Sequence, residues 1–454
     1  MGLLIKNGEI ITASSRFVAD IWCEDEKVTR IDKNLGAPAG AQVIDATGKY
    51  VFPGFIDPHT HIYLPFMGTY GKDDYESGTI AALCGGTTTI FDLAIMARDG
   101  EPQDALDLWH SKAEGIACCD YSFHMGVTRW DEDLADKLEK IAQSGVKSFK
   151  IFLGYKGALG VEDDELFNIL KLAKKLNVLV TAHCENAAMI EQRQKELLAE
   201  GKTGPEWHEP SRPELVEVAG TRHFCDMAEL TGARIYVVHL SCEGALRAAM
   251  EAKLRGVNVT IETLLVYLLL DKTYAERPNF EGAKYVMSPP LRDKRNQDIL
   301  WAGIKNRLIS TLGTDHAPFD TQQKKMGKDN FAQIPNGIPS VEDRVRLFYT
   351  QGVASGRVDL HTFVDLCSTQ VAKTFGLFPR KGTVQVGADA DLVVYDPAYR
   401  GTISASTHHM NIDYSAFEGR EVIGRCDAVS VRGKVQVIDG EFVGKKGHGK
   451  FLAR

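Results

Sequence analysis

The sequence predicts an α/β protein built on a (β/α)8, TIM-like barrel, with a smaller β-sandwich domain made from both ends of the chain. From about residue 52, short apolar runs rich in β-branched residues alternate with helix-length amphipathic segments, which is typical of βα units around a parallel sheet. Eight such runs occur. Both ends of the chain have a different pattern, with short alternating strands between turn residues.

The eight predicted barrel strands follow one another through the middle of the chain. Each is a short apolar run, and each is followed by a segment long enough to form a helix. Eight units of this kind form a barrel with an inner ring of strands and an outer ring of helices. The predicted strands span residues 54–59, 87–93, 121–127, 148–153, 177–183, 234–240, 257–263 and 308–315.

The two ends of the chain predict one further domain. Segments such as "LLIKNGEIIT" near the start and "VSVRGKVQVIDGEFVG" near the end alternate apolar and polar residues between turn signals. The economical interpretation is one β-sandwich made of residues 1–51 and 378–454, into which the barrel of residues 52–377 is inserted. The sequence contains no short internal repeat and no low-complexity linker, which is consistent with this organisation.

Composition narrows the classes of function. The chain of 454 residues is 44% hydrophobic, and its formal charge of −8 with no dense Lys/Arg block argues against nucleic acid or membrane partners and favours small molecules. Nine cysteines without a C-x-x-C pair fit reduced thiols. The N-terminus lacks signal-peptide features, and the longest apolar run, residues 264–270, is too short to span a bilayer. We therefore expect a cytoplasmic protein.

Polar residues gather at the carboxyl ends of the predicted barrel strands, where barrel enzymes carry their chemistry. Imidazole and carboxylate groups are the ligands expected for Zn²⁺ or a related divalent ion. A lone H-x-H pair would be weak evidence, since strand-end histidines often only bond a neighbour. Their joint occurrence at the ends of five strands makes a metal site the better interpretation. The candidate residues are His59, His61, Lys150, His183, His239 and Asp315.

Lys150 raises a separate question, because it lies inside the apolar run "SFKIFLGY". Burying an ammonium is expensive. The residue could extend from a strand end into solvent, pair with a buried acid, or serve the chemistry of the site. The remaining histidines have no comparable position and are interpreted as surface or packing residues, with His316 a candidate to support Asp315.

Several segments together resemble the cyclic amidohydrolases, and within them the dihydropyrimidinase and D-hydantoinase branch. The similarity runs over essentially the whole chain, including the flanking "IDATGKYVFPG" and "KGTVQVGADADLVVYDP". The motifs are specific in combination. They are "PGFIDPHTH", "SFKIFLGY", "VTAHCEN", "YVVHLS", "MSPPLR", "GTDHAPF" and "IPNGIPSVEDR".

The resemblance implies an amidohydrolase-type barrel that holds two divalent metal ions, with Zn²⁺ the expected metal. His59 and His61 would bind the more buried ion together with Asp315, and His183 and His239 the more exposed one. Lys150 would be carboxylated on its amine by CO₂, so that this carbamate and a hydroxide bridge the two metals. Desolvation favours the neutral amine that such carboxylation requires.

The resemblance also implies how the site would act. A hydroxide would attack the ring carbonyl, Tyr155 would stabilise the developing oxyanion, and Asp315 would carry the proton to the leaving ring nitrogen. Main-chain groups of Ser288 and Asn336 would hold the amide atoms of the ring. Apolar gate loops would contact its exocyclic substituent, although ordinary packing is an equal alternative for their side chains. The gate residues are Leu64, Phe66, Phe152 and Leu159.

We therefore expect a metal-dependent hydrolase that opens dihydrouracil, dihydrothymine or 5-substituted hydantoins to N-carbamoyl amino acids. Allantoinase, dihydroorotase and imidase are alternatives within the enzymes, but Tyr63 stands where a dihydroorotase is expected to place an arginine. A non-catalytic scaffolding relative is the alternative from another class, and the full ligand set argues against it. The resemblance also suggests a homodimer or homotetramer.

Overall fold

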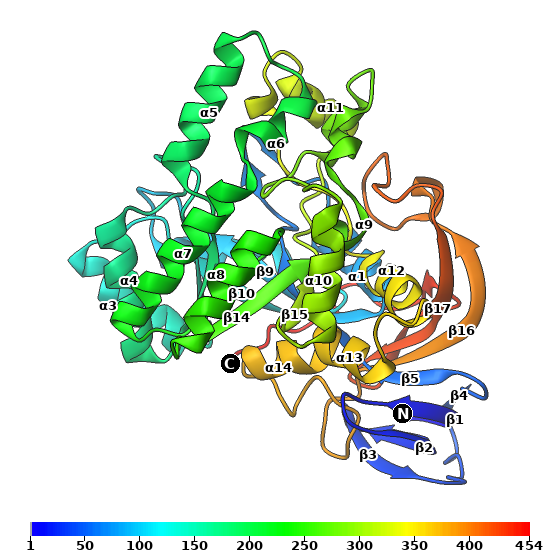
Figure 1. Ribbon diagram of the computed structural model, residues 1–454. Helices are drawn as coiled ribbons and strands as arrows, with labels where there is room; N and C mark the ends of the chain where they lie inside the picture. The colour runs from blue at the N-terminus through cyan, green and yellow to red at the C-terminus, as the bar shows by residue number, and fades with distance from the viewer. Residues whose placement is uncertain (1) are drawn as a thin grey trace.

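Eight parallel strands form a ring at the centre of the structure (Figure 1). The structure is a computed structural model and describes residues 2–454. Each strand pairs with the next along the chain, and all eight strands predicted from the sequence are present. The strands are β6 (Phe55–Thr60), β9 (Thr87–Ile95), β10 (Asp120–Gly126), β11 (Ser148–Phe152), β12 (Leu179–His183), β13 (Ile235–Val237), β14 (Val259–Leu264) and β15 (Thr311–Gly313).

Strands β13 and β15 are shorter than predicted at their carboxyl ends. His239 and Asp315, which the sequence placed inside these strands, have φ values of 39° and 51°. Such values lie in the left-handed region, so the backbone leaves the extended conformation at both residues. The two side chains therefore project from irregular segments that follow the strands.

The ring closes between its last and first strands, at their carboxyl ends. The amide of Asp315 donates to the carbonyl of His59 at 2.9 Å, and the amide of His61 donates to the carbonyl of His316 at 2.8 Å. These two bonds join segments that lie far apart in the sequence. They hold the predicted site residues of the first and last strands side by side.

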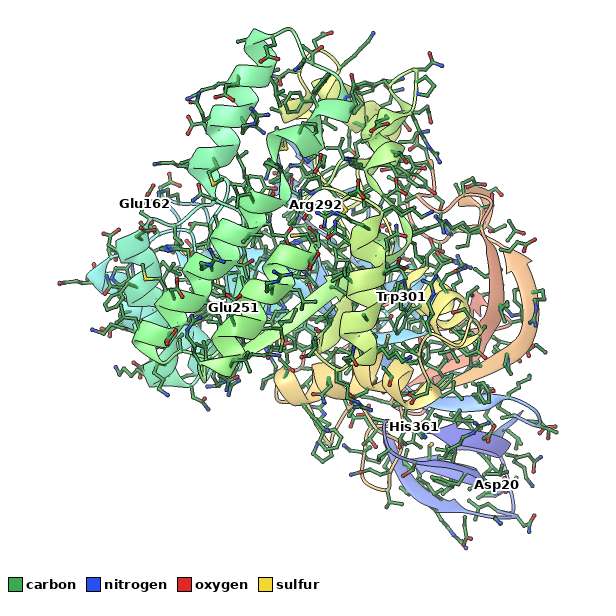
Figure 2. All side chains as sticks on the ribbon, in the orientation of Figure 1. Asp20, Glu162, Glu251, Arg292, Trp301 and His361 are labelled. Atoms are coloured by element: carbon green, nitrogen blue, oxygen red, sulfur yellow. The ribbon has the colours of Figure 1, made fainter. Side chains whose placement is uncertain are left out.

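Helices surround the ring, and their buried faces pack on it and on one another (Figure 1). Trp301 of α10, labelled in Figure 2, stacks on Phe348 of α12 (Arg344–Phe348) with ring centroids 5.6 Å apart. No helix within residues 2–454 is both long and apolar enough to cross a membrane. The longer helices are α1 (Tyr75–Cys84), α2 (Pro102–Ala113), α3 (Glu132–Gln143), α4 (Asp163–Leu176), α5 (Ala187–Ala199), α7 (Glu214–Thr231), α8 (Glu243–Leu254) and α10 (Arg295–Lys305).

Shorter helical segments lie mainly in the loops and after the last barrel strand. Helices α12, α13 and α14 are extended by the π-helical turns η6 (Tyr349–Val353) and η7 (Asp365–Thr369). The short α-helices are α6 (His208–Ser211), α9 (Leu265–Leu269), α11 (Thr321–Lys324), α12 (Arg344–Phe348), α13 (Leu360–Val364) and α14 (Gln370–Thr374).

The two ends of the chain form a separate, mainly antiparallel sheet, which confirms the predicted second domain (Figure 1). The strands of this domain follow one continuous hydrogen-bonded path, β19-β18-β17-β16-β5-β1-β2-β3, with β4 pairing to β1. Register shifts in β16 bend the sheet. The strands are β1 (Leu3–Ile11), β2 (Arg16–Glu24), β3 (Lys27–Asp32), β4 (Gln42–Asp45), β5 (Tyr50–Pro53), β16 (Leu392–Thr402), β17 (Glu421–Val431), β18 (Lys434–Ile438) and β19 (Glu441–Phe442).

A buried charge cluster joins this sheet to the barrel. The ammonium of Lys381 lies 2.6 Å from the carboxylate of Asp120 and 2.5 Å from that of Asp391. The end of the chain returns to the same place, because the amide of Leu452 donates to the carbonyl of Tyr121 at 2.8 Å. Asp120 and Tyr121 begin β10, so this junction covers the amino ends of the barrel strands. The opposite, carboxyl end carries the predicted site.

Candidate active site

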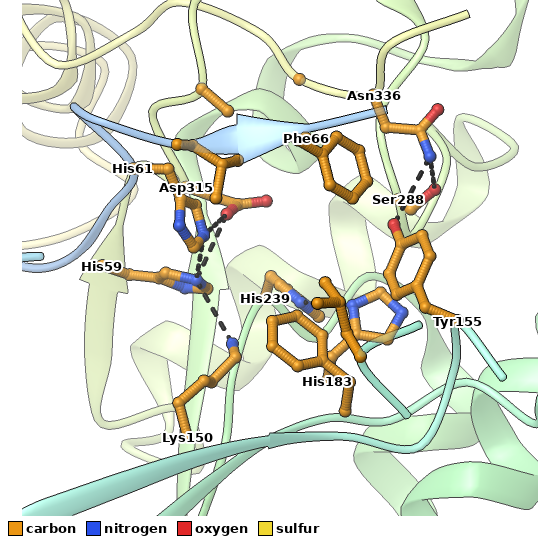
Figure 3. A pocket seen from close by; sticks show the side chains of 15 residues that line it. His59, His61, Phe66, Lys150, Tyr155, His183, His239, Ser288, Asp315 and Asn336 are labelled. Carbon is orange, nitrogen blue, oxygen red and sulfur yellow. Dashed lines mark hydrogen bonds and ion pairs between the residues drawn. The ribbon is translucent and has the colours of Figure 1, made fainter. Parts of the chain in front are cut away.

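One cavity at the carboxyl end of the barrel contains every residue that the sequence predicted for the site (Figure 3). The residues come from strand ends and from the loops that follow them. Ala317 and Gly337 complete its lining. The predicted residues brought together are His59, His61, Leu64, Phe66, Lys150, Phe152, Tyr155, Leu159, His183, His239, Ser288, Asp315 and Asn336.

Four imidazoles and one carboxylate form two adjacent groups (Figure 3). In the first, Asp315 Oδ1 lies 2.9 Å from His61 Nε2 and 3.2 Å from His59 Nε2, and the two Nε2 atoms are 3.2 Å apart. In the second, His183 Nδ1 lies 3.0 Å from His239 Nε2. The rings of His59 and His239 stack at a centroid distance of 5.4 Å, which brings the two groups together.

Burial sets the protonation of these side chains. It lowers the pKa of His59 and of His239 well below the ordinary value, and it also lowers the pKa of His183. Burial alone would raise the pKa of Asp315, but His59 and His61 outweigh it and hold that pKa at about 2. At neutral pH the site therefore presents imidazole lone pairs and a carboxylate anion.

Carboxylates behind the cavity orient two of the imidazoles. His59 Nδ1 donates to Glu262 Oε1 at 2.9 Å, and His183 Nε2 donates to Glu185 Oε2 at 2.8 Å. The pKa of Glu185 is held at about 2, so this anion only accepts, and the proton of the His183 ring faces away from the cavity. Burial raises the pKa of Glu262 to about 7, but its Oε1 atom also accepts from the amide of His239, so the proton of the His59 ring points at that oxygen. The unprotonated nitrogens, His59 Nε2 and His183 Nδ1, face into it.

A buried charge network supports this second layer. Arg212 donates to Glu185 at 2.6 Å. Burial alone would raise the pKa of Glu185, but Arg212 and His183 outweigh it and hold that pKa at about 2. Arg292, near the centre of the molecule in Figure 2, donates to Glu217 at 2.9 Å and to the carbonyl of Arg212. The paired charges keep Glu185 anionic and fixed behind His183.

Lys150 is almost completely buried, with 2% of its surface exposed. Its Nζ lies 3.4 Å from His59 Nε2, and no carboxylate of residues 2–454 lies within ion-pair distance. Burial lowers the pKa of this amine. Neither extension into solvent nor a buried ion pair accounts for this environment, and a pKa of about 8 gives this amine a larger neutral fraction than an ordinary lysine has.

The donor set fits divalent metal ions. Two imidazoles and a carboxylate, His59, His61 and Asp315, offer ligand atoms that all lie within 4.8 Å of one another. His183 and His239 add two nitrogens beside them. Nitrogen and oxygen donors of this kind suit Zn²⁺ and similar ions. With the rings of His59 and His183 oriented from behind, these side chains have the chemistry of a metal site.

Tyr155, Ser288 and Asn336 meet on the other side of the cavity (Figure 3). Asn336 Nδ2 donates to Ser288 Oγ at 3.0 Å and to the Tyr155 hydroxyl at 3.4 Å. Burial raises the pKa of Tyr155, so its phenol keeps its proton at neutral pH. Tyr155 has a φ of 59°, and this uncommon backbone conformation turns its ring toward the cavity.

The four predicted gate residues line the cavity and also pack against other apolar side chains. Leu64 and Phe66 lie with Ala317 and Phe319 in one small apolar cluster. The Phe66 ring meets the Tyr155 ring edge-on at 5.5 Å. The gate residues thus both pack against their neighbours and line the cavity, and their side chains give one wall of the cavity an apolar surface.

Sequence reasoning missed the residues behind the metal-site candidates. Glu262, which lies inside β14, accepts bonds from His59, from the amide of His239 and from Tyr236. A single acidic residue in the predicted strand "VNVTIET" was the available signal. His316, which the sequence suggested as a supporting residue, contacts the first strand and a loop. Its carbonyl accepts from the amide of His61, and its ring bonds Asp73 at 2.9 Å.

Replacing Glu262 by glutamine should weaken metal binding by about 10- to 100-fold, because the amide group keeps the shape but cannot accept on both of its ends, as the carboxyl group does from His59 and Tyr236. Metal affinity can be measured by competition with a chromophoric chelator. Glu251, exposed on α8, provides the matched control as Glu251→Gln. Equal metal affinity in the Glu262→Gln variant and the control would contradict a supporting role for Glu262.

Comparison with known proteins places this geometry in a family. Residues 50–435 match the model of the amidohydrolase family. A D-hydantoinase of Geobacillus stearothermophilus is 49% identical over 457 residues, covering 100% of this chain and 97% of the relative. A dihydropyrimidinase of Rattus norvegicus is 39% identical, covering 100% of this chain and 88% of the relative.

Solved structures of similarly named proteins also superimpose closely on this chain. The D-hydantoinase (dihydropyrimidinase) from Thermus sp. superimposes with a TM-score of 0.98 at 61% identity, covering 100% of this chain and 99% of that one. The L-hydantoinase from Arthrobacter aurescens gives a TM-score of 0.91 at 29% identity, covering 100% and 99%. The resemblance inferred from the motifs is thereby confirmed, and the chain belongs to the amidohydrolase family, which is metal-dependent.

Proposed function

We propose that this protein is a metal-dependent hydrolase that opens the rings of dihydropyrimidines and 5-substituted hydantoins, giving N-carbamoyl amino acids. The observation that carries the proposal is the meeting of four imidazoles, Asp315 and a buried, unpaired Lys150 in one cavity. Full-length similarity to proteins named D-hydantoinase and dihydropyrimidinase supports hydrolytic opening of cyclic amides.

In this proposal the cavity holds two divalent ions, which we take to be Zn²⁺. His59, His61 and Asp315 would hold one ion, and His183 and His239 the other. Lys150, as a carbamate, would supply an oxygen to each. The ions would activate water as the nucleophile and polarise the scissile carbonyl.

Tyr155 and Asp315 would move charge and protons during the reaction. The Tyr155 phenol, which burial keeps protonated, would donate to the carbonyl oxygen as negative charge develops there. Asp315, which is anionic at neutral pH, would accept the proton of the attacking water. It would then deliver that proton to the leaving ring nitrogen, so one carboxylate would serve as base and then as acid.

Loop residues would select the substrate. Main-chain groups at Ser288 and Asn336 would bind the planar amide edge of the ring. Leu64, Phe66 and Leu159, together with Phe152, would surround the exocyclic substituent. This apolar wall favours a neutral or hydrophobic group at that position.

A dihydroorotase is disfavoured by the charges of the cavity. Its substrate carries a carboxylate, which needs a cationic partner. Lys150 is the only lysine or arginine of residues 2–454 that lines the cavity. Tyr63 is not among the lining residues, and its ring stacks on Tyr70 at 5.5 Å.

The assembly and location of the protein are also proposals. We propose a homodimer or homotetramer, which similarity to the family supports. All nine cysteines are unpaired, and eight of them are buried, which suits a reducing cytoplasm.

Purified protein should open dihydrouracil and a 5-monosubstituted hydantoin, with the N-carbamoyl amino acid identified by mass spectrometry. Dihydroorotate and allantoin serve as comparison substrates. We expect kcat/KM for a neutral ring to exceed that for dihydroorotate by at least about 10²-fold, because the carboxylate finds no cationic partner. Faster turnover of dihydroorotate or allantoin would contradict the proposed substrate class.

A further inference from the structure

Lys324, the last residue of α11, is a second buried lysine, with 1% of its surface exposed. Its ammonium donates to three main-chain carbonyls: Val286 at 2.9 Å, Pro335 at 2.7 Å and Gly337 at 2.8 Å. An ammonium has three protons, so these bonds use its full donor capacity. No carboxylate of residues 2–454 lies within ion-pair distance of it.

The three carbonyls belong to the two loops that would bind the substrate ring. Val286 lies two residues before Ser288, whereas Pro335 and Gly337 stand on either side of Asn336. The loops also bond each other directly, because the amide of Gly337 donates to the carbonyl of Val286 at 3.0 Å. Lys324 thus adds a side chain from a third segment that reaches both loops at once.

Stability alone is a poor explanation for a charge at this position. Burial lowers the pKa of Lys324 well below its ordinary value, and no opposite charge offsets the desolvation. The cost of desolvating the ammonium offsets part of what its three hydrogen bonds contribute to stability. One nitrogen with three diverging donors does what an apolar side chain cannot, since it fixes three carbonyls relative to one another.

We infer that Lys324 is a positioning residue that sets the spacing and orientation of the two loops carrying Ser288 and Asn336. The inference rests on the proposed function, in which main-chain groups of these loops bind the amide edge of a cyclic amide. That edge is planar and rigid, so its donors and acceptors need partners at a fixed separation. Lys324 itself does not line the cavity, and it acts through the loops.

The test is a Lys324→Met variant of the metal-loaded enzyme, which keeps the length of the side chain and removes its donors. Exposed Lys325, the next residue, gives the matched control as Lys325→Met. We expect KM for dihydrouracil to rise at least about tenfold in Lys324→Met, with kcat within about threefold of wild type, because ring binding is lost equally in ground and transition states. Metal content should stay unchanged, and Lys325→Met should behave as wild type.

A double variant separates positioning from general destabilisation. Asn336→Ala keeps the main chain but removes the side chain that bonds Ser288 Oγ and joins the two loops. If Lys324 sets the spacing of the same loops, the KM increases of Lys324→Met and Asn336→Ala should combine to less than their product. A purely structural role would lower the melting temperature while leaving KM of the folded enzyme unchanged. Lys324→Gln, which keeps two donors, should show a smaller KM increase than Lys324→Met.

Several results would overturn the inference. An active wild-type enzyme with an unchanged KM in Lys324→Met would overturn the positioning role alone, and so would fully multiplicative KM effects with Asn336→Ala. If neither Lys324→Met nor Lys324→Gln yields folded, metal-loaded protein, the lysine serves the fold and the inference is wrong. A metal-loaded wild type that opens neither dihydrouracil nor any hydantoin would overturn the proposed function, and the inference with it.

Discussion

Metal content and turnover of a Lys150→Ala variant are expected to collapse together. In the proposed site a carbamate on Lys150 supplies a shared anion to both metals. Without it, four imidazoles and Asp315 must hold two cations whose mutual repulsion is no longer offset. The amine is buried and has no ion-pair partner, so its removal leaves no structural carboxylate unpaired. Metal stoichiometry and kcat measured on folded Lys150→Ala protein test this expectation.

Small acids provide the control for this prediction. Lys150→Ala leaves space for a short carboxylate, so added acetate or propionate should restore part of the metal content and activity. The same acids should do nothing for His61→Ala, whose lost ligand is a nitrogen on one metal. A lysine with only a packing role would change stability by about a few kcal/mol at most. Wild-type metal content and kcat in Lys150→Ala would show that the carbamate assignment is wrong.

Replacing Tyr155 by phenylalanine should lower kcat by about 10²- to 10³-fold, with metal content unchanged. The substitution keeps the ring, including its edge contact with Phe66, and removes one donor to the developing oxyanion. Steady-state kinetics on dihydrouracil and elemental analysis of the same sample measure both quantities.

Tyr63 offers the matched control for Tyr155. It lies outside the cavity lining and packs against Tyr70 and Trp109, so Tyr63→Phe should turn over as wild type does. Nearly wild-type kcat in Tyr155→Phe would refute its oxyanion role. A fall in metal content in the same variant would instead assign Tyr155 to the integrity of the site.

The barrel and the gathering of its polar residues were predictable because both follow from local patterns. Each strand is a short apolar run, and parallel strands of a closed barrel end on the same side. His59, His183 and Asp315 therefore had to come close in space, although more than 250 residues separate the first from the last. A residue at the carboxyl end of a predicted barrel strand can therefore be assigned to the site from sequence alone.

The supporting residues were not predictable, because their partners come from distant segments. Nothing local distinguishes Lys324 from Lys325, yet one is buried on three carbonyls and the other is exposed. Glu262 likewise gains its role from His59, which lies on a different strand. The single bent sheet of the second domain was not predictable for the same reason, because its strand order depends on pairing between the two ends of the chain.

In the proposed function, ring opening depends on a pair of metals in this cavity. The most direct test removes metal with a chelator and titrates Zn²⁺ back while dihydrouracil hydrolysis is followed in the same sample. Metal-free protein should be inactive, and activity should rise until about two Zn²⁺ are bound per chain. Full activity without metal, or saturation at one Zn²⁺ per chain, would contradict this expectation.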